Sequence, residues 1–213
     1  EEALPKHIKL AYLPSPGIVK LRLSGRGTNE INLLNQIEII FSKIESRISK
    51  HVFSKKEAQL QEILGGIFRA KKLTISTAES LTSGAIASRI TSVPGASEYF
   101  IGGIVAYAND VKIHQLGVSE NVLKSAGAVS GEVVKQMAIG AQNLFGTDYA
   151  IATSGIAGPG GGTDEKPVGT VWVAIAGPKG VVTEQFQMGK GRDRVVEKTI
   201  FSALNLLLQL VSQ

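Results

Sequence analysis

The sequence predicts a three-layer α/β/α domain with a mixed sheet, preceded by a small α+β module. Two observations predict this fold class. From residue 54 onward, strand and helix patterns alternate, which is typical of a sheet covered by helices on both faces. Later in the chain, a Gly-Pro-Lys-Gly turn at residues 177–180 joins two strands as a hairpin, which makes the sheet mixed. Because the pattern before residue 54 differs, we place the domains at residues 1–53 and 54–213.

The first module is predicted to begin with a β-hairpin over residues 7–14 and 18–24. In its second strand Val19 and Leu21 alternate with charged residues, and a Pro-Ser-Pro-Gly turn separates the two segments. A helix with Asn29 as its cap follows. Its apolar residues recur at helical spacing: Leu34, Ile37, Phe41, Ile44 and Ile48.

The second domain is predicted to begin with a helix whose capping box is Ser54-Lys55-Lys56-Glu57. Its apolar stripe consists of Leu60, Ile63, Leu64, Ile67 and Phe68. Strands are then predicted over residues 73–77, 102–107, 149–153, 168–176 and 181–187, and helices from about 82, from 109, over 119–126 and 130–145, and from about 192 to 210. The one long irregular segment is the glycine-rich loop, residues 154–167, and loops of that length are usually functional or disordered.

The composition excludes several classes of protein. The chain has no cysteine, which excludes a disulfide scaffold, a zinc ribbon, a thiol nucleophile and an iron–sulfur cluster, and favours a reducing, cytoplasmic location. Its longest apolar runs fall far short of the roughly 20 residues that a membrane-spanning helix needs, so we expect a soluble protein. There is no initiator methionine and no signal peptide, and we therefore expect a fragment of a longer chain.

Three segments could carry chemistry at the sheet edge where ligands bind in such folds. In the first, Thr77 to Gly84, small hydroxyl residues would let a substrate approach a helix N-terminus that favours anions; alternatively, Ser80 or Thr82 only caps that helix. In the second, Tyr107 ends a strand, Asn109 caps the next helix, and Lys112 lies in its first turn. A lysine there opposes the helix dipole, which suggests a task for it, although it could be an ordinary exposed lysine.

The third segment is the glycine-rich loop, which could wrap a phosphate or ribose or form a structural turn. It lacks the Gly-Lys-Ser/Thr of a P-loop, and it leads into a strand where a dinucleotide fingerprint needs a helix.

A Ser-His-Asp triad is not expected, because His7 and His51 lie in the first module and His114 lies on a different helix face from Lys112. If Ser80 is a nucleophile, we expect its base to be a lysine, as in the Ser-Lys variants of acyl-transfer enzymes. Such a lysine must be neutral, so its pKa of about 10.4 must fall by about three units, or roughly 4 kcal/mol. Burial behind Tyr107 is one way to achieve this.

From about Lys56 to the end, the sequence resembles the CinA family, specifically its C-terminal domain, the nicotinamide mononucleotide deamidase. The resemblance rests on Thr77-Ala78-Glu79-Ser80, Tyr107-x-Asn109-x-x-Lys112, Gly127-Ala128-Val129-Ser130, the Ser154 to Gly162 run, Glu165-Lys166-Pro167-Val168-Gly169-Thr170-Val171, and Gly191-Arg192. It implies hydrolysis of the carboxamide of nicotinamide mononucleotide to nicotinate mononucleotide and ammonia, without a metal or cofactor.

By the same resemblance, Ser80 attacks the carboxamide, Lys112 takes its proton, and Tyr107 orients the lysine or passes a proton to the ammonia. Backbone N–H groups near Thr82 and Gly84 stabilise the oxyanion. The nucleotide substrate is contacted by further residues: Asn109, Gly158, Gly160, Gly161, Thr163 and Arg192. Arg192 could instead be a solvated first-turn residue.

The chain departs from the family after the serine, where most members carry Cys-Thr-Gly-Gly and this sequence has Leu81-Thr82-Ser83-Gly84. Ser83 adds a side chain where glycine allowed a close backbone approach. A catalytically weak domain kept for ligand binding or scaffolding is therefore an alternative, against which the intact Ser80, Tyr107 and Lys112 argue.

The first module, residues 1–53, resembles the KH-type module that joins this domain to an N-terminal molybdopterin-binding-like domain in longer family members. It carries most of the net charge of +5: residues 1–57 hold ten Lys or Arg against six Asp or Glu, and the rest hold thirteen against twelve. Nucleic-acid binding is therefore a competing function. The glycines before residue 57 are only Gly17, Gly25 and Gly27, so the Gly-x-x-Gly clamp is missing. We interpret the module as a connector or dimerisation element and expect a homodimer.

Overall fold

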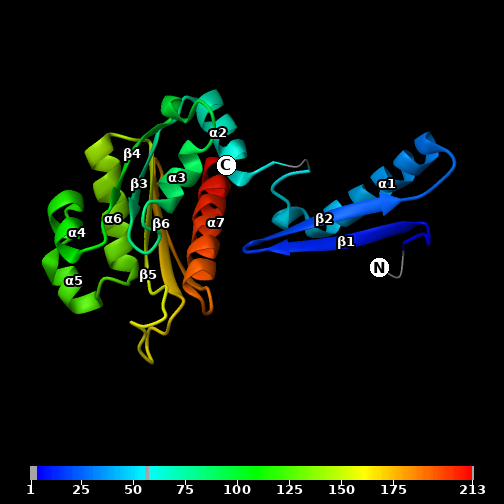
Figure 1. The fold of residues 1–213 in the computed structure, drawn as a ribbon. Coiled ribbons are helices and arrows are strands. Elements are labelled where there is room, and N and C mark those ends of the chain that lie inside the picture. Colours follow the sequence, from blue (N-terminus) through cyan, green and yellow to red (C-terminus); the bar gives the residue numbers. More distant parts are fainter. Residues whose placement is uncertain (1–3, 56–57, 213) are drawn as a thin grey trace. The chain divides into compact units, whose positions relative to one another are not determined.

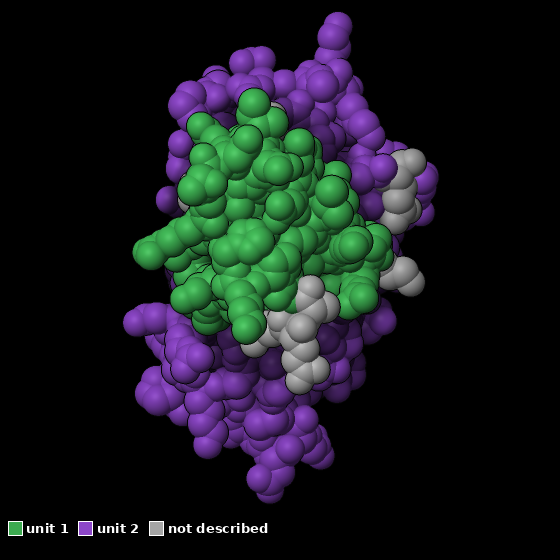
Figure 2. Space-filling model, turned by 90° about the vertical axis from the view of Figure 1, so that its right-hand side faces the viewer, with its two compact units in different colours: residues 1–58 green, residues 59–213 purple. Residues whose placement is uncertain are grey.

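The computed structural model describes residues 4–55 and 58–212, which form two compact units, Glu1–Ala58 and Gln59–Gln213. Figure 2 distinguishes the two units by colour. The boundary lies a few residues after the predicted one. Within the described ranges, no helix is long and apolar enough to cross a membrane.

The first unit consists of a hairpin and a helix. Strands β1 (Ile8–Ser15) and β2 (Ile18–Gly25) pair antiparallel, so the predicted hairpin is confirmed. Helix α1 (Glu30–Ile48) and the 3₁₀ helix η1 (Ser49–His51) follow. The side chain of Asn29 accepts a hydrogen bond from the N–H of Asn32 at 2.9 Å, so this residue is the predicted cap.

The second unit begins with α2 (Leu60–Lys71), which starts later than the predicted capping box at Ser54 to Glu57 would place it. Gln59 and Glu62 form the box instead: the N–H of Gln59 donates to Glu62 Oε2 at 2.9 Å. Ser54 and Lys55 precede the helix, and Lys56 and Glu57 lie outside the described residues. A polar residue followed three positions later by glutamate occurs twice here, at Ser54 and at Gln59. The helix begins at the second, because the apolar stripe that packs it starts only at Leu60.

The second unit contains the predicted mixed sheet (Figure 1), in the order β4-β3-β5-β6-β7. Its strands are β3 (Ile75–Glu79), β4 (Phe100–Val105), β5 (Tyr149–Gly155), β6 (Thr170–Gly177) and β7 (Gly180–Gln187). Strand β3 pairs parallel with β4 and β5, whereas β6 pairs antiparallel with both β5 and β7.

Helices cover both faces of this sheet, as predicted for a three-layer fold. They are α3 (Ala85–Thr91), η2 (Ala96–Glu98), α4 (Asn109–Leu116), α5 (Glu120–Ala126), α6 (Gly131–Phe145) and α7 (Arg192–Val211). In Figure 1, α6 lies on one side of the sheet with α4 and α5 beyond it, and α3 and α7 lie on the other. Val134 and Met137 of α6 pack on strand alanines such as Ala152 and Ala174, whose small side chains let the helix lie close to the sheet.

The strand directions bring several loops to one edge of the sheet. The carboxyl ends of β3, β4 and β5 share this edge because the three strands are parallel. Strand β7 also ends there, since β6 reverses the direction and β7 reverses it again. The segments that follow these four strands therefore start from the same carboxyl edge, which is the usual ligand edge of such sheets.

Candidate active site

Ser80 follows β3 directly and begins a tight turn at the carboxyl edge. Its N–H donates to the carbonyl of Thr153 on β5 at 3.0 Å, and its carbonyl accepts from the N–H of Ser83 at 3.2 Å. The residue is half-buried, so its hydroxyl lies at the boundary between the protein interior and solvent. Such a position suits a nucleophile that a substrate must reach.

The N-cap residue of α3 is Gly84, and the side chain that caps its first turn is that of Glu79, which is neither of the two residues considered from the sequence. The Glu79 carboxylate accepts from three backbone N–H groups: Gly84 at 3.1 Å, Ile86 at 2.9 Å and Ala87 at 2.8 Å. The side chain is 1% exposed. The helix also begins later than predicted, at Ala85. The alternative in which Ser80 or Thr82 caps this helix is therefore wrong.

This capping changes which backbone groups are free for chemistry. The N–H of Gly84 is engaged by Glu79 and so is not free to donate to an oxyanion. The Thr82 hydroxyl is also engaged: it is 2% exposed and lies 2.9 Å from the Thr153 hydroxyl. Within the described chain, the backbone N–H groups of Leu81 and Thr82 donate to no protein acceptor. These two N–H groups follow Ser80 directly and are the donors left in the turn.

Ser83 adopts a left-handed backbone conformation, with φ of 53°. Glycine adopts this region without a steric cost, whereas an L-residue loses about 1–2 kcal/mol there. The Ser83 side chain is exposed. The glycine of the family pattern is therefore explained by backbone conformation.

Lys112 is a buried lysine, which excludes the alternative of an ordinary surface residue. It is 1% exposed, and its Nζ donates to the carbonyls of Ala106 at 2.7 Å and Tyr107 at 3.0 Å. Burial lowers the pKa of this amine, because the charged form loses its hydration. A lowered pKa is what a lysine needs to serve as a general base.

The Tyr107 side chain does not bury the lysine, contrary to one expectation. It is 62% exposed, and the carbonyl of Tyr107 is the group that contacts Lys112. Asn109 also differs from its prediction: it is the first residue of α4, the N-cap is Ala108, and no side chain caps the helix. The phenol of Tyr107 therefore faces solvent near the site.

Backbone hydrogen bonds connect the Ser80 turn to Lys112. The N–H of Ala106 donates to the carbonyl of Glu79 at 2.8 Å, and the carbonyl of Ala106 accepts from Lys112 Nζ. The nucleophile candidate and the base candidate are thus held by adjacent strand ends. Among the described residues, no hydrogen bond joins the Ser80 hydroxyl to the Lys112 amine directly, and no group of three or more His, Asp or Glu side chains could hold a metal.

Two basic side chains anchor the glycine-rich loop through hydrogen bonds to backbone carbonyls. Arg192 Nη1 donates to the carbonyl of Gly158 at 3.2 Å, and Lys166 Nζ donates to the carbonyl of Ala126, at the end of α5, at 2.7 Å. Thr163 builds a turn within the loop, since its hydroxyl accepts from the N–H of Lys166 at 3.0 Å. Arg192 is exposed, yet it anchors the loop, so it is more than a solvated first-turn residue. Gly160 and Gly161 lie exposed at the tip of this loop.

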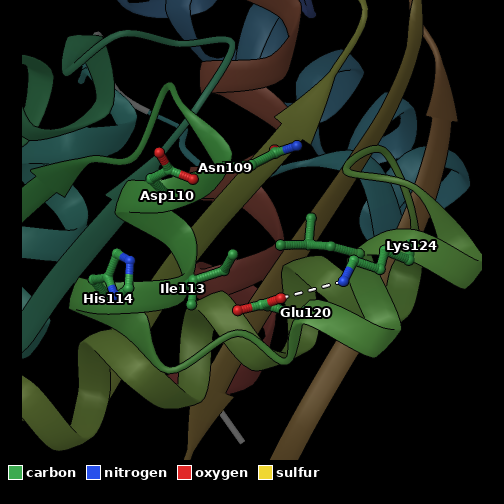
Figure 3. Close-up of a pocket in the computed structure, with 7 residues that line it drawn as sticks. Asn109, Asp110, Ile113, His114, Glu120 and Lys124 are labelled. Carbon is green, nitrogen blue, oxygen red and sulfur yellow. Dashed lines mark hydrogen bonds and ion pairs between the residues drawn. The ribbon is translucent and has the colours of Figure 1, made fainter.

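A cavity of about 320 Å³ lies beside α4 and α5 (Figure 3). It is lined by Asn109, Asp110, Ile113, His114, Glu120, Leu123 and Lys124. Asn109 is the predicted site residue that the described lining contains, whereas Ser80 and Lys112 lie outside it. Lys124 pairs with Glu120 at 3.3 Å across one wall. This cavity is therefore not the predicted catalytic centre.

Sequence reasoning missed three residues that organise the site. Glu79 caps α3, Lys166 anchors the glycine-rich loop, and the Ser154 hydroxyl donates to the carbonyl of Ala128 at 2.7 Å. One signal was available for Glu79, because a carboxylate at the end of an otherwise uncharged strand needs buried partners. The partners of the other two lie 40 and 26 residues away, and no local pattern reveals them.

A model of the CinA C-terminal domain family matches residues 57–211. The chain is 48% identical over 208 residues to a CinA-like protein of Flavobacterium psychrophilum and 44% identical over 207 residues to one of Cytophaga hutchinsonii. Each alignment covers 97% of this chain and 50% of the relative. The chain thus spans about half the length of the curated relatives it matches.

Solved structures are similar as well. The competence/damage inducible protein CihA from Agrobacterium tumefaciens superposes with a TM-score of 0.70 at 39% identity, covering 72% of this chain and 94% of that one. A competence-damaged protein (CinA) superfamily protein from Escherichia coli superposes with a TM-score of 0.70 at 30% identity, covering 76% and 98%.

Proposed function

Since this chain belongs to the CinA C-terminal domain family, we propose that it hydrolyses the carboxamide of nicotinamide mononucleotide, giving nicotinate mononucleotide and ammonia. The observation that carries the proposal is the buried Lys112 amine, bonded to the carbonyl of Ala106, whose N–H bonds in turn to the residue before Ser80. A desolvated lysine beside a reachable serine is the arrangement that Ser-Lys acyl-transfer enzymes use. The two relatives are named only as CinA-like, and the names of the solved structures refer to competence and damage, so support for this reaction comes from the site and from the resemblance of its motifs.

In the proposed reaction the Ser80 hydroxyl attacks the carboxamide carbon while Lys112 takes its proton. To do so, the Lys112 amine must turn from one of its two carbonyl partners toward Ser80, as catalytic hydrogen bonds often form only with substrate bound. The N–H groups of Leu81 and Thr82 donate to the oxyanion. The intermediate then collapses: the C–N bond breaks, and ammonia leaves with the proton that Lys112 took from Ser80, passed directly or through the exposed Tyr107 phenol, which Lys112 reprotonates. The neutral Lys112 then accepts a proton from the water that attacks the acyl-enzyme. The bond from the acyl carbon to Ser80 breaks, Lys112 returns this proton to Ser80, and the acid product loses its own proton to solvent.

The glycine-rich loop is proposed to hold the ribose phosphate. Arg192 uses one of its five N–H donors on the carbonyl of Gly158, which leaves others for a phosphate. The exposed Gly160 and Gly161 offer backbone N–H groups, and Thr163 lies in the turn beside them. Asn109 opens α4 at the same edge and is proposed to contact the substrate there.

Incubating the chain with nicotinamide mononucleotide tests the function directly. We expect ammonia, measured by a coupled glutamate dehydrogenase assay, and an equal amount of nicotinate mononucleotide by chromatography. Ser80→Ala should abolish turnover and leave mononucleotide binding by calorimetry largely intact, because the phosphate and ribose are held elsewhere. Ser88→Ala, at an exposed position of α3, is the matched control and should keep the parent rate. A folded chain that releases no ammonia would overturn the proposal, and turnover by Ser80→Ala would overturn its mechanism.

The first unit is proposed to be a KH-type connector that leads to a further domain. Its antiparallel hairpin and the helix α1 that follows it support this proposal. It carries the basic surplus of the chain, but the clamp that grips a nucleic-acid backbone is missing from residues 1–57. We therefore assign it a connecting or dimerising role.

A further inference from the structure

We propose that Glu79 is a positioning residue for Ser80: its buried carboxylate fixes the Ser80–Gly84 turn and so aims the N–H groups of Leu81 and Thr82 at the reacting carbonyl. This inference rests on the proposed function. It adds a residue that touches neither the substrate nor the reacting atoms in that scheme and acts through the turn.

The Glu79 carboxylate holds the C-terminal end of the Ser80–Gly84 turn. One carboxylate oxygen accepts from both Gly84 and Ile86, and the other accepts from Ala87, at 2.8–3.1 Å. Glu79 also stands next to Ser80 in the chain, so both ends of the turn are attached to the same residue. Its backbone carbonyl, bonded to the N–H of Ala106, links that residue to the strand end that holds Lys112.

The charge of Glu79 has a second effect. A buried carboxylate is stable only where donors replace its lost hydration, and three backbone N–H groups at a helix start do this well. Within the described part of the chain, no cation pairs with Glu79. The Glu79 carboxylate therefore offsets, from inside the protein, the partial positive charge of the N–H groups in the first turn of α3. This leaves the task of binding the oxyanion to the two N–H groups that Glu79 does not take.

A second attachment holds the same turn. The Thr82 hydroxyl and the Thr153 hydroxyl lie 2.9 Å apart in the interior, which fixes the middle of the turn to β5. If the turn geometry controls the reactivity of Ser80, loosening either attachment should have the same kind of effect. This gives a test that does not depend on one substitution.

The experiment measures how fast a fluorophosphonate probe labels Ser80, by mass spectrometry, together with kcat and KM for nicotinamide mononucleotide. Glu79→Gln keeps the shape but places an NH₂ group against backbone N–H donors. We expect labelling and kcat to fall at least ten-fold with KM within about three-fold of the parent value, because the phosphate is held elsewhere. Glu79→Asp, which retains the charge but is one methylene shorter, should rescue neither rate, since its carboxylate cannot reach all three donors.

The control is Ser76→Ala on the same strand. Ser76 is 0% exposed and its hydroxyl bonds to Thr147 on the α6 side of the sheet, so this variant loses a buried hydrogen bond away from Ser80. It should lower the melting temperature and keep the parent labelling rate. A folded Glu79→Gln variant that labels Ser80 at the parent rate would overturn the proposal.

If Glu79→Gln does not fold, Thr82→Val decides the question. It removes the bond to Thr153 with almost no change in volume, and parent-rate labelling in this variant would overturn the proposal. The parent chain separates this outcome from failure of the proposed function. A parent that labels at Ser80 but releases no ammonia refutes the substrate alone, whereas a parent that does not label at Ser80 refutes the nucleophile and, with it, the role of Glu79.

Discussion

At the scale of single residues, Lys112 shows how the fold changes the chemistry of a side chain. Moving an ammonium from water into the interior is unfavourable, and the two carbonyl partners replace only part of its hydration. The neutral amine loses much less on burial, so the pKa of Lys112 falls below its ordinary value. The same burial that disfavours the charged amine leaves more of it neutral, and only the neutral form can accept a proton.

Lys112→Met is predicted to lose at least about 100-fold in kcat/KM, because the general base is gone. In the parent, kcat/KM should rise with pH through an apparent pKa below the roughly 10.4 of free lysine, since only the neutral amine accepts a proton. A pH–rate profile of the parent and single-pH rates of the variant check this. Lys112→Arg should also be inactive, because guanidinium stays protonated, and substantial activity in that variant would exclude the proton-accepting role.

Lys112→Met should lose activity but gain thermal stability. The pKa of Lys112 is lower in the folded than in the unfolded chain, so the unfolded state binds more protons between the two pKa values and stability rises with pH across that window. Below the window the folded state bears the full cost of the buried charge. Lys112→Met should therefore raise the melting temperature at neutral pH, measured by calorimetry. A lower melting temperature would mean that the carbonyl contacts outweigh desolvation.

Ser83→Gly is predicted to stabilise the protein by up to about 1 kcal/mol, since Ser83 has a φ of 53° that glycine adopts without strain. The gain is reduced because glycine also makes the unfolded chain more flexible. Ser83→Ala is the matched control and should show no gain. Urea denaturation of both variants measures the difference, and if Ser83→Gly also kept or raised turnover, serine here would not mark a catalytically weak domain.

At the scale of elements, the site depends on how loops are attached to helices. The ammonium of Lys166 bonds to the last carbonyl of α5, where the helix dipole favours a cation. Ser154 of β5 bonds to Ala128 just beyond the same helix end. The glycine-rich loop is therefore fixed to the α5–α6 connection on one side and, through Arg192, to α7 on the other.

Lys166→Met is predicted to raise KM for the mononucleotide about three- to ten-fold with little change in kcat, because a loosened loop must be ordered on binding. Stability should fall by about 1 kcal/mol through the lost hydrogen bond. Steady-state kinetics and urea denaturation measure both effects. Lys179→Met, in the exposed β6–β7 turn, is the control and should change neither. A large fall in kcat alone would place Lys166 in the chemistry and not in loop anchoring.

At the scale of the whole molecule, the basic surplus and the proposed active site belong to different units. Residues 1–57 carry ten of the 23 basic side chains against six of the 18 acidic ones, whereas the proposed active site lies wholly in the second unit. A basic surface without base-reading or clamping elements attracts nucleic acid only through counterion release. The surplus therefore does not by itself indicate specific recognition.

The chain is predicted to bind neither single-stranded DNA nor RNA specifically. Fluorescence anisotropy with short labelled oligonucleotides should show weak binding at low salt that disappears steeply as salt rises, because only phosphate contacts contribute. Sub-micromolar affinity at physiological salt that survives a modest salt increase would contradict this and favour a nucleic-acid function for the first unit.

The sequence by itself determined the order and type of the elements and the edge of the sheet at which the candidate site residues lie. The hairpin, the mixed sheet and the long α7 follow from periodicity and turn residues, which are local properties of the chain. Ser80, Tyr107 and Lys112 stand at strand–helix junctions, and parallel strands bring such junctions to one edge.

Only the tertiary structure decided which of these groups are buried, bonded or free. Lys112 is buried, and the ring of Tyr107 is exposed although its carbonyl holds the lysine. Glu79 replaces the hydroxyl caps because the strand ends with its carboxylate inside the protein, where backbone N–H groups are the available donors. The Thr82–Thr153 bond joins residues 71 positions apart. Burial and partners depend on what the rest of the chain brings to a position, and neither periodicity nor local spacing contains that information.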